Sequence, residues 1–278
     1  MDNNVLDTCD VFGVNVAISN MDQAVQDIKE NIKSLQGQYV CFTNVHTIVT
    51  AHENPKYAMV QNEAYMAFPD GKPVSLYMNK LLGGNGLASQ VAGPDFMRSM
   101  WKATEGTGLS HYFYGSSPET ISMLREVLER DYPGLKIAGM ESPPFRQLTS
   151  KEDIEAVKRI NDSGADFVWV GLGAPKQEIW MWKHRNKATG ACDKIASVDV
   201  KGISSEQVDA SCNPHQVNAL MLGVGAGFDF HAGTVKRAPK IMQKLYLEWL
   251  YRLMQDPKRL WKRYLKTNLK FLWWGLKG

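Results

Sequence analysis

The alternation of short apolar runs with amphipathic segments is the feature that most restricts the fold of this chain. It extends over about 225 residues, and the runs FGVNVAI, YVCFTN, HYFYG and DFVWVGLG have the length and the β-branched or aromatic content of strands. Segments with helical periodicity separate these runs. Such alternation is typical of a parallel sheet that is covered by helices on both faces. The sequence therefore predicts an α/β fold, with a Rossmann-like domain over residues 1–233.

Two segments depart from the alternation. Residues 193–213 are polar, weakly periodic and long for a connection, so we expect an inserted loop there. From residue 234 onward there is no strand signal, and apolar residues recur at helical spacing. We therefore expect the α/β domain to carry a C-terminal helical appendage over residues 234–278.

The appendage also holds most of the positive charge. It contains twelve Lys and Arg but only the two acids Glu248 and Asp256, so its net charge is +10, whereas the whole chain carries +3. Trp and Tyr are interleaved with the basic residues, which suits the headgroup layer of an anionic membrane. A helical cap that packs on the domain is an alternative, and both can hold at once. No nucleic-acid-binding motif is present, so nucleic acid is not an expected partner.

The turns that follow the predicted strands indicate where a ligand would bind. In open α/β sheets, ligands bind outside the carboxyl ends of the strands. Three such turns contain Gly115, Gly173 and Gly225, and glycine lets the backbone approach a ligand closely. A nucleotide-type ligand is therefore expected, although glycine is also common in plain turns. Neither a P-loop nor a complete dinucleotide-binding fingerprint is present.

The segment FPDGKPVS places Asp70 between a proline and a glycine, directly after an apolar run. A carboxylate at such a strand end can accept the proton of an acceptor hydroxyl. One base is enough for an inverting displacement at a sugar carbon, because a nucleoside diphosphate leaves with little acid assistance. The alternative is that Asp70 only caps the next helix, and the spacing does not decide between the two.

The segment GLGAPKQE predicts a helix that begins at Pro175, with Lys176, Gln177 and Glu178 in its first turn. The amide of Gln177 can both donate to and accept from sugar hydroxyls. A plain helix start with solvated polar residues is the alternative.

Several other signals are missing from the sequence. It contains no DxD, no HExxH and no grouping of Cys with His, so neither a metal nor another cofactor is expected. There is no signal-peptide pattern and no run of about 18 apolar residues, and the cysteines are scattered as in reduced proteins. We therefore expect a cytoplasmic protein that lies peripherally on the inner face of the cell membrane.

In their order and spacing, six segments resemble the WecG/TagA/CpsF glycosyltransferases: FTNVHTIV, FPDGKPV, VAGPDFM, GLGAPKQE, GVGAGFDFHAGTVKRAP and LEWLYRLMQDPKRLWKRY. The resemblance extends from Val11 to Arg263. It implies a metal-independent, inverting transfer of a sugar from a UDP-sugar to a polyprenyl-diphosphate-linked acceptor. It also implies an appendage that associates with the membrane and helps to close the active site. Donors in the family carry N-acetylmannosamine, glucose or glucuronic acid.

The resemblance also implies roles for single residues. Asp70 matches the proposed catalytic base, and Thr43 and Asn44 match a polar active-site pair. Arginines of the appendage match residues that can reach diphosphate groups. We therefore expect Asp70 and Thr43 to act in catalysis. The residues expected to bind substrate are Asn44, Gly71, Gln90, Gly93, Asp95, Gly115, Gly173, Pro175, Lys176, Gln177, Glu178, Gly225, Phe228, Asp229, Arg237, Arg252 and Arg259.

The chain departs from the family pattern in two places. Members often have an arginine where this sequence has Gln90. If that arginine contacts a diphosphate, another cation must replace it here, and Arg98 and Lys72 are the candidates. The insertion at 193–213 is also unusual and has no predicted role.

The sequence leads to one main hypothesis and two alternatives. The main hypothesis is a peripheral-membrane glycosyltransferase of cell-surface polysaccharide assembly, with self-association left open. A nicotinamide-dependent oxidoreductase would need a glycine fingerprint after the first strand, where VNVAISN has no glycine. A non-enzymatic membrane or nucleic-acid adaptor would need only the appendage.

Overall fold

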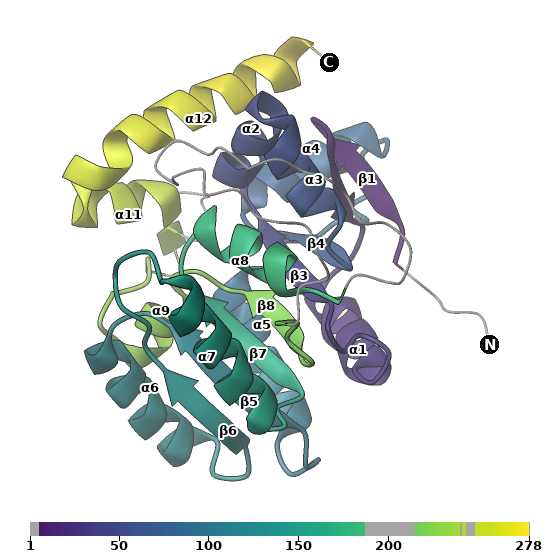
Figure 1. Cartoon of the computed structure of the whole chain (residues 1–278). Coiled ribbons are helices and arrows are strands. Elements are labelled where there is room, and N and C mark those ends of the chain that lie inside the picture. The colour runs from purple at the N-terminus through teal and green to yellow at the C-terminus, as the bar shows by residue number, and fades with distance from the viewer. Residues whose placement is uncertain (1–5, 187–214, 240, 243–247, 278) are drawn as a thin grey trace.

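The computed structural model of the protein describes residues 6–186, 215–239, 241–242 and 248–277 (Figure 1). The side chains of residues 259, 260, 262–265 and 277 are outside this description. The expected inserted loop at 193–213 also lies outside the described residues.

Six strands form one sheet in the order β4-β3-β8-β7-β5-β6, and every neighbouring pair is parallel. The chain runs from β3 outward to β4 and then builds the other half of the sheet on the opposite side of β3, which is a doubly wound topology. The predicted α/β fold is therefore confirmed. The strands are β3 (Tyr39–Thr43), β4 (Met66–Pro69), β5 (Ser110–Gly115), β6 (Lys136–Glu141), β7 (Phe167–Gly171) and β8 (Leu220–Gly223).

Polar caps fix where several helices begin. Asn20 and Gln23 form a capping box at the start of α1, and Ser117 caps α6. Pro175 is the N-cap of α8, so this helix begins one residue later than predicted. The helices are α1 (Met21–Asn31), α2 (Val45–Glu53), α3 (Pro55–Asn62), α4 (Lys72–Leu81), α5 (Gly93–Thr104), α6 (Pro118–Asp131), α7 (Ser150–Asp162), α8 (Lys176–His184), α9 (Gly227–Ala232), α11 (Glu248–Gln255) and α12 (Pro257–Lys277).

The first apolar run, FGVNVAI, does not join the parallel sheet. It supplies β2 (Val14–Ala17), which pairs antiparallel with β1 (Thr8–Val11), the segment directly before the run. Phe12 and Gly13 make the two-residue turn, both with positive φ, which returns the chain directly to its own neighbour. The geometry of this turn therefore determines which strand the run pairs with. The alternation of buried and exposed residues along the run does not determine that partner.

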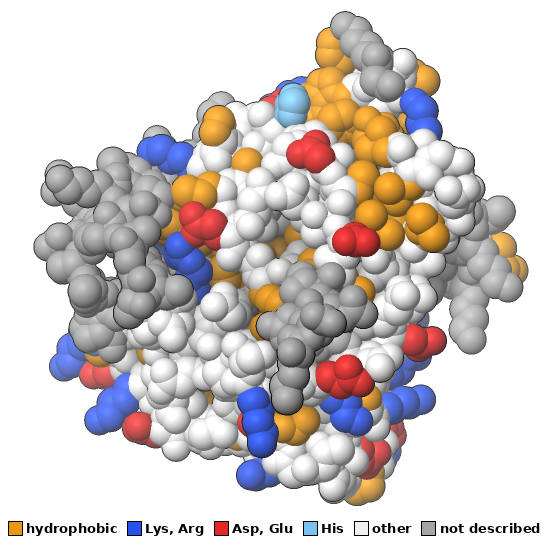
Figure 2. Space-filling view, turned by 90° about the vertical axis from the view of Figure 1, so that its right-hand side faces the viewer, with side chains coloured by type: hydrophobic (Ala, Val, Ile, Leu, Met, Phe, Trp, Pro, Cys, Tyr) orange, Lys and Arg blue, Asp and Glu red, His pale blue; other side chains and the backbone are white. Residues whose placement is uncertain are grey.

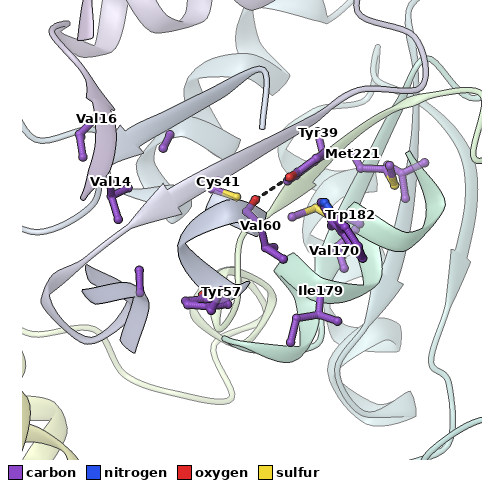
Figure 3. Close-up of a cluster of buried hydrophobic side chains, with 14 of the residues drawn as sticks. Val14, Val16, Tyr39, Cys41, Tyr57, Val60, Val170, Ile179, Trp182 and Met221 are labelled. Carbon is purple, nitrogen blue, oxygen red and sulfur yellow. Dashed lines mark hydrogen bonds between the residues drawn. The ribbon is translucent and has the colours of Figure 1, made fainter. Parts of the chain in front are cut away.

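The parallel strands are buried on both faces. In β3, Tyr39 and Cys41 belong to one apolar cluster, whereas Val40 and Phe42 belong to the other. The first cluster packs against α2, α3, α4, α7 and α8, and Figure 3 shows part of it. The second packs against α1, α5, α6 and α9. Because both faces are covered, polar chemistry is restricted to the strand ends and to fully paired interior groups.

The C-terminal helices pack against the α/β domain, and α12 lies across α2 (Figure 1). Phe271 is buried, and its ring lies 5.5 Å from that of Phe12 and 5.7 Å from that of Tyr77. Lys80 Nζ donates a hydrogen bond to the carbonyl oxygen of Gly275 (2.8 Å). The expected C-terminal helical segment is present, while the domain boundary at residue 234 stays a prediction.

Among the described residues, no helix combines the length and the apolar character needed to cross a membrane.

We predict that Gly115→Ala destabilises the fold strongly. Gly115 has φ +138, and a Cβ there would lie 2.5 Å from the backbone carbon of Gly171 on the neighbouring strand. The backbone strain and the overlap together should lower the free energy of unfolding by about 3 kcal/mol or more. Urea unfolding measures this change.

Gly164→Ala is the matched control. Gly164 also has positive φ (+63), but nothing lies within 4 Å of the position that a Cβ would take there. In Gly164→Ala, the free energy of unfolding should fall only by the conformational cost of a positive φ in alanine, which is about 1 to 2 kcal/mol. Equal losses in the two variants would show that the close approach of β5 and β7 does not matter.

Candidate active site

A cavity of about 700 Å³ opens at the carboxyl ends of β3 and β4. The turns after these strands form one wall, and α11 and α12 form the other. Of the predicted site residues, the cavity brings together Asn44, Asp70, Gly71, Gln90, Arg237 and Arg252.

The backbone around Asp70 fixes the carboxyl group at this cavity. Its N–H donates to the carbonyl oxygen of Thr43 (2.8 Å), which ties the end of β4 to the end of β3. Gly71 follows with φ +106 and is the N-cap of α4, and no side chain caps this helix. The Asp70 carboxyl group is therefore free of the capping role that the sequence had left open.

Asp70 is held in a state that suits a base near neutral pH. The pKa of Asp70 is raised to about 7, mainly because the carboxyl group is buried and secondly because the Glu248 carboxylate lies nearby. Arg252 and Arg237 act in the opposite direction, as does a hydrogen bond with the Asn44 side chain. Desolvation is the largest of these effects, so a proton can be taken up and released near pH 7.

Arg237 is anchored by two carboxylates. Its guanidinium group donates to both oxygens of Asp95 at 2.7 Å and to Glu248 Oε1 at 3.2 Å. These partners raise the pKa of Arg237, and Arg237 holds the pKa of Asp95 below its usual range despite burial. Arg98 also pairs with Asp95 (3.1 Å). Asp95 therefore serves as a counter-ion in this structure and does not line the cavity.

The two candidate replacements for the family arginine differ in position. Lys72 lines the cavity beside Gln90, whereas Arg98 does not. Arg252 also lines it, with its guanidinium carbon 5.2 Å from the centre of the Phe230 ring. Lys72 and Arg252 are thus the described cations best placed to meet a diphosphate.

A second cavity, of about 360 Å³, lies at the carboxyl ends of β5 and β7. Ser116, Lys176 and Trp180 are among its lining residues, together with the segment 143–148 after β6. The Trp180 ring stacks on that of Tyr114, with centroids 4.9 Å apart. The cavity thus offers an aromatic floor and cationic side chains, which is a suitable surface for a nucleotide.

Gln177 is buried, and its amide is fully used within the protein. Oε1 accepts from the N–H groups of Gly173 (3.1 Å) and Gly225 (2.9 Å). Nε2 donates to Glu178 Oε1 (2.9 Å) and to the carbonyl oxygen of Gly223 (2.9 Å). The structure thus assigns this amide to shaping two glycine turns, and leaves it no group with which to bind a sugar hydroxyl.

Four other predicted residues line neither cavity. Thr43 is fully buried, and its hydroxyl donates to Gln61 Oε1 (2.7 Å). Gly93 and Phe228 are buried, Phe228 in the core under Gly171. Asp229 accepts from Ser116 Oγ (2.8 Å) and so holds α9 to the turn before α6.

For Arg259, the structure places the backbone in α12, and its side chain lies outside the described residues.

Glu248 is the functional candidate that the sequence analysis missed. It lines the cavity, acts on Asp70 and binds Arg237. The sequence did contain one indication of a role for Glu248, because it is one of only two acids in a strongly basic segment. Within the described residues, no group of three or more His, Cys, Asp or Glu side chains is arranged to hold a metal ion.

Comparison with known proteins decides the class of this site. The sequence profile described as "Glycosyl transferase WecG/TagA/CpsF family" matches residues 9–196 and 205–278. The chain belongs to this family. It is therefore a glycosyltransferase, as the resemblance predicted, and the oxidoreductase and adaptor alternatives are not supported.

A curated relative in Bacillus spizizenii (strain ATCC 23059 / NRRL B-14472 / W23) is similar to most of the chain. It is 30% identical over 230 residues, which cover 83% of this chain and 76% of the relative. Its name is N-acetylglucosaminyldiphosphoundecaprenol N-acetyl-beta-D-mannosaminyltransferase.

We predict that the Asp70 carboxyl group titrates near pH 7 and that Glu248→Gln lowers this pKa. The substitution removes a like charge, so less work is needed to ionise Asp70. Carboxyl-carbon NMR during a pH titration measures both values.

Glu141→Gln serves as the control, because Glu141 pairs with Arg159 on the far half of the sheet (2.5 Å). The Asp70 titration should be unchanged in that variant. A midpoint near pH 4 in the unsubstituted protein would contradict the electrostatic account of the site.

Proposed function

We propose that this glycosyltransferase moves a sugar from a UDP-sugar to a polyprenyl-diphosphate-linked saccharide, with inversion at the anomeric carbon and without a metal. The observation that carries the proposal is the Asp70 carboxyl group, whose pKa is raised to about 7 at the wall of a cavity that cationic side chains also line. A base with this pKa is matched to proton transfer near neutral pH.

In the proposed reaction, the acceptor hydroxyl gives its proton to the Asp70 carboxylate while its oxygen bonds to the anomeric carbon. The bond from that carbon to the UDP oxygen breaks on the opposite face, and the electron pair leaves on the diphosphate. Lys72 and Arg252 support this step, because they line the same cavity and oppose the negative charge that develops.

The carboxyl edge of the sheet offers room for the donor. We place the sugar beside Asp70 and the nucleotide toward the second cavity, where Trp180 and Lys176 lie. The turns at Gly173 and Gly225 follow β7 and β8, which lie between β3 and β5 in the sheet, and both glycines have positive φ, which only glycine adopts easily. Their backbone is thus suited to close approach by a diphosphate.

The acceptor lipid is supported by the apolar wall of the first cavity. Trp261 and Leu272 line that cavity and are also exposed at its rim, at 50% and 61% of their surface. Farther along α12, Trp273 and Leu276 are exposed as well. These exposed apolar side chains offer a polyprenyl chain a surface along α12 from a bilayer to the cavity.

An exposed apolar patch extends this surface onto the α/β domain. Leu76 and Leu81 of α4 and Leu87 in the following loop are each about half exposed. Figure 2 shows hydrophobic side chains gathered at the upper right, at the height of the C-terminal end of α12. We propose that this face rests on an anionic membrane, to which the basic appendage is attracted.

The relative's name supports a specific substrate pair. It describes transfer of N-acetylmannosamine to N-acetylglucosaminyl-diphospho-undecaprenol, and we propose the same pair here. Assay of UDP-N-acetylmannosamine, UDP-glucose and UDP-glucuronic acid with a short-chain lipid-diphosphate acceptor tests the choice.

We predict that Asp70→Asn loses turnover by about 10² to 10⁴-fold, because the amide cannot accept the proton. Donor binding, measured by calorimetry, should be largely kept. Asp131→Asn, at an exposed surface position paired with Arg130, should behave like the unsubstituted protein. Undiminished turnover in Asp70→Asn would remove the base from the mechanism.

We predict that removing residues after Thr234 leaves a folded α/β domain but abolishes both most of the activity and sedimentation with anionic vesicles. A milder variant, Leu272→Gln/Trp273→Gln/Leu276→Gln, should weaken vesicle partitioning about tenfold or more, since it removes exposed apolar surface only. Met123→Gln/Ile154→Gln, on α6 and α7 away from α12 (Figure 1), is the control. Equal sedimentation of all variants would refute the membrane contact.

A further inference from the structure

Glu178, in the first turn of α8, is a buried acid that lines neither cavity and has no part in the mechanism above. It is 1% exposed, and no ion pair to it is present among the described residues. Its Oε1 accepts from Gln177 Nε2 (2.9 Å), while Oε2 is buried without a hydrogen-bond partner in the described part of the chain. Burial raises the pKa of Glu178 to about 7. Such a group needs an explanation, because an isolated buried acid is costly to retain.

Glu178 determines which way the Gln177 amide points. The amide oxygen must face the N–H groups of Gly173 and Gly225, since a reversed amide would set donors against donors. In that orientation Nε2 faces the Gly223 carbonyl oxygen and Glu178 Oε1. Glu178 thus supplies one of the two acceptors for Gln177 Nε2. With both acceptors present, every hydrogen-bonding group of the Gln177 amide has a partner in this orientation.

A buried chain of hydrogen bonds also runs from the other wall of the site to Tyr57, which neighbours Glu178. The Thr43 hydroxyl donates to Gln61 Oε1 (2.7 Å), and Gln61 Nε2 donates to the Tyr57 hydroxyl (2.9 Å). Tyr57 lies close enough to Glu178 for each group to act on the pKa of the other. The Thr43 hydroxyl and the Gln61 amide both donate in the direction of Tyr57, and Thr43, Gln61, Tyr57 and Glu178 are each at most 1% exposed.

The two ends of this chain are the two parts of the proposed site. One end is Thr43, whose carbonyl oxygen accepts from the Asp70 N–H. The other end is the Gln177 amide, which holds the turns at Gly173 and Gly225. These elements come from β3, α3, α8 and the turn after β8, so no local sequence feature couples them.

We propose that Glu178 is a positioning residue for sugar transfer, which holds the donor-side glycine turns through Gln177 and registers them against the Asp70 turn through Tyr57 and Gln61. The reaction itself rests on the proposed function, but the positioning of the turns does not. A misplacement of about 1 Å between donor and base is enough to cost about a hundredfold in rate.

The test compares Glu178→Leu, which removes the acceptor, with Glu178→Gln, which keeps a neutral acceptor oxygen of the same shape. In Glu178→Leu, the turnover of folded enzyme should fall about a hundredfold and the donor KM should rise. Glu178→Gln should stay within about threefold of the unsubstituted protein, because the acceptor is retained. Tyr57→Phe should fall between the two.

Tyr39→Phe is the matched control for Tyr57→Phe. Both tyrosines are fully buried on the same side of the sheet (Figure 3), but the Tyr39 hydroxyl donates to the Val60 carbonyl oxygen (2.5 Å), outside the chain that reaches Glu178. A loss of stability without a change in donor KM is expected for this variant.

A readout that needs no activity separates this inference from the proposed function. Amide hydrogen exchange at Gly173 and Gly225 should accelerate in Glu178→Leu and stay slow in Glu178→Gln and Tyr39→Phe. Failure of the unsubstituted protein to transfer any sugar would count against the proposed function alone. Unchanged exchange at both glycines in Glu178→Leu would overturn the positioning role.

Discussion

Burial of the parallel sheet on both faces is the constraint on which the rest of this protein depends. Apolar side chains fill both sides of β3, β7 and β8, so a polar group in the interior must find a partner there. The strand ends are the remaining places for chemistry, and both cavities open at them. The same constraint explains why Gln177 and Thr43, although polar and close to the site, are bound entirely within the protein.

The electrostatics of the first cavity depend on two parts of the chain that are distant in sequence. The α/β domain supplies Asp70, and its burial raises the pKa. The C-terminal helical segment supplies both Glu248, which raises that pKa further, and Arg252, which lowers it. Arg237 joins the two parts through Asp95 and Glu248. Docking of this segment thus sets the charge around the base as well as the shape of the cavity.

Local patterns predicted much of the fold. The strand–helix alternation indicated the parallel sheet, and Pro175 marked the start of α8 within one residue. The prediction failed for FGVNVAI, because the positive φ angles at Phe12 and Gly13 close a hairpin that alternation alone cannot distinguish from a sheet strand. Of the predicted site residues, Asp70 and Asn44 line the cavity, whereas Asp95 and Phe228 do not, and the predicted roles of all four stay predictions.

The sequence by itself determined the class of fold, the family, the acid at the strand end and the basic C-terminal segment, because each depends on residues that are neighbours or evenly spaced in the chain. Only the tertiary structure decided which polar groups face a ligand. The order of strands brings α3 beside α8 and the turn after β8 beside the turn after β7. The periodicity of apolar residues along the chain does not predict this order. The pairing of Glu178 with Gln177, and of Glu248 with Arg237, follows from that arrangement.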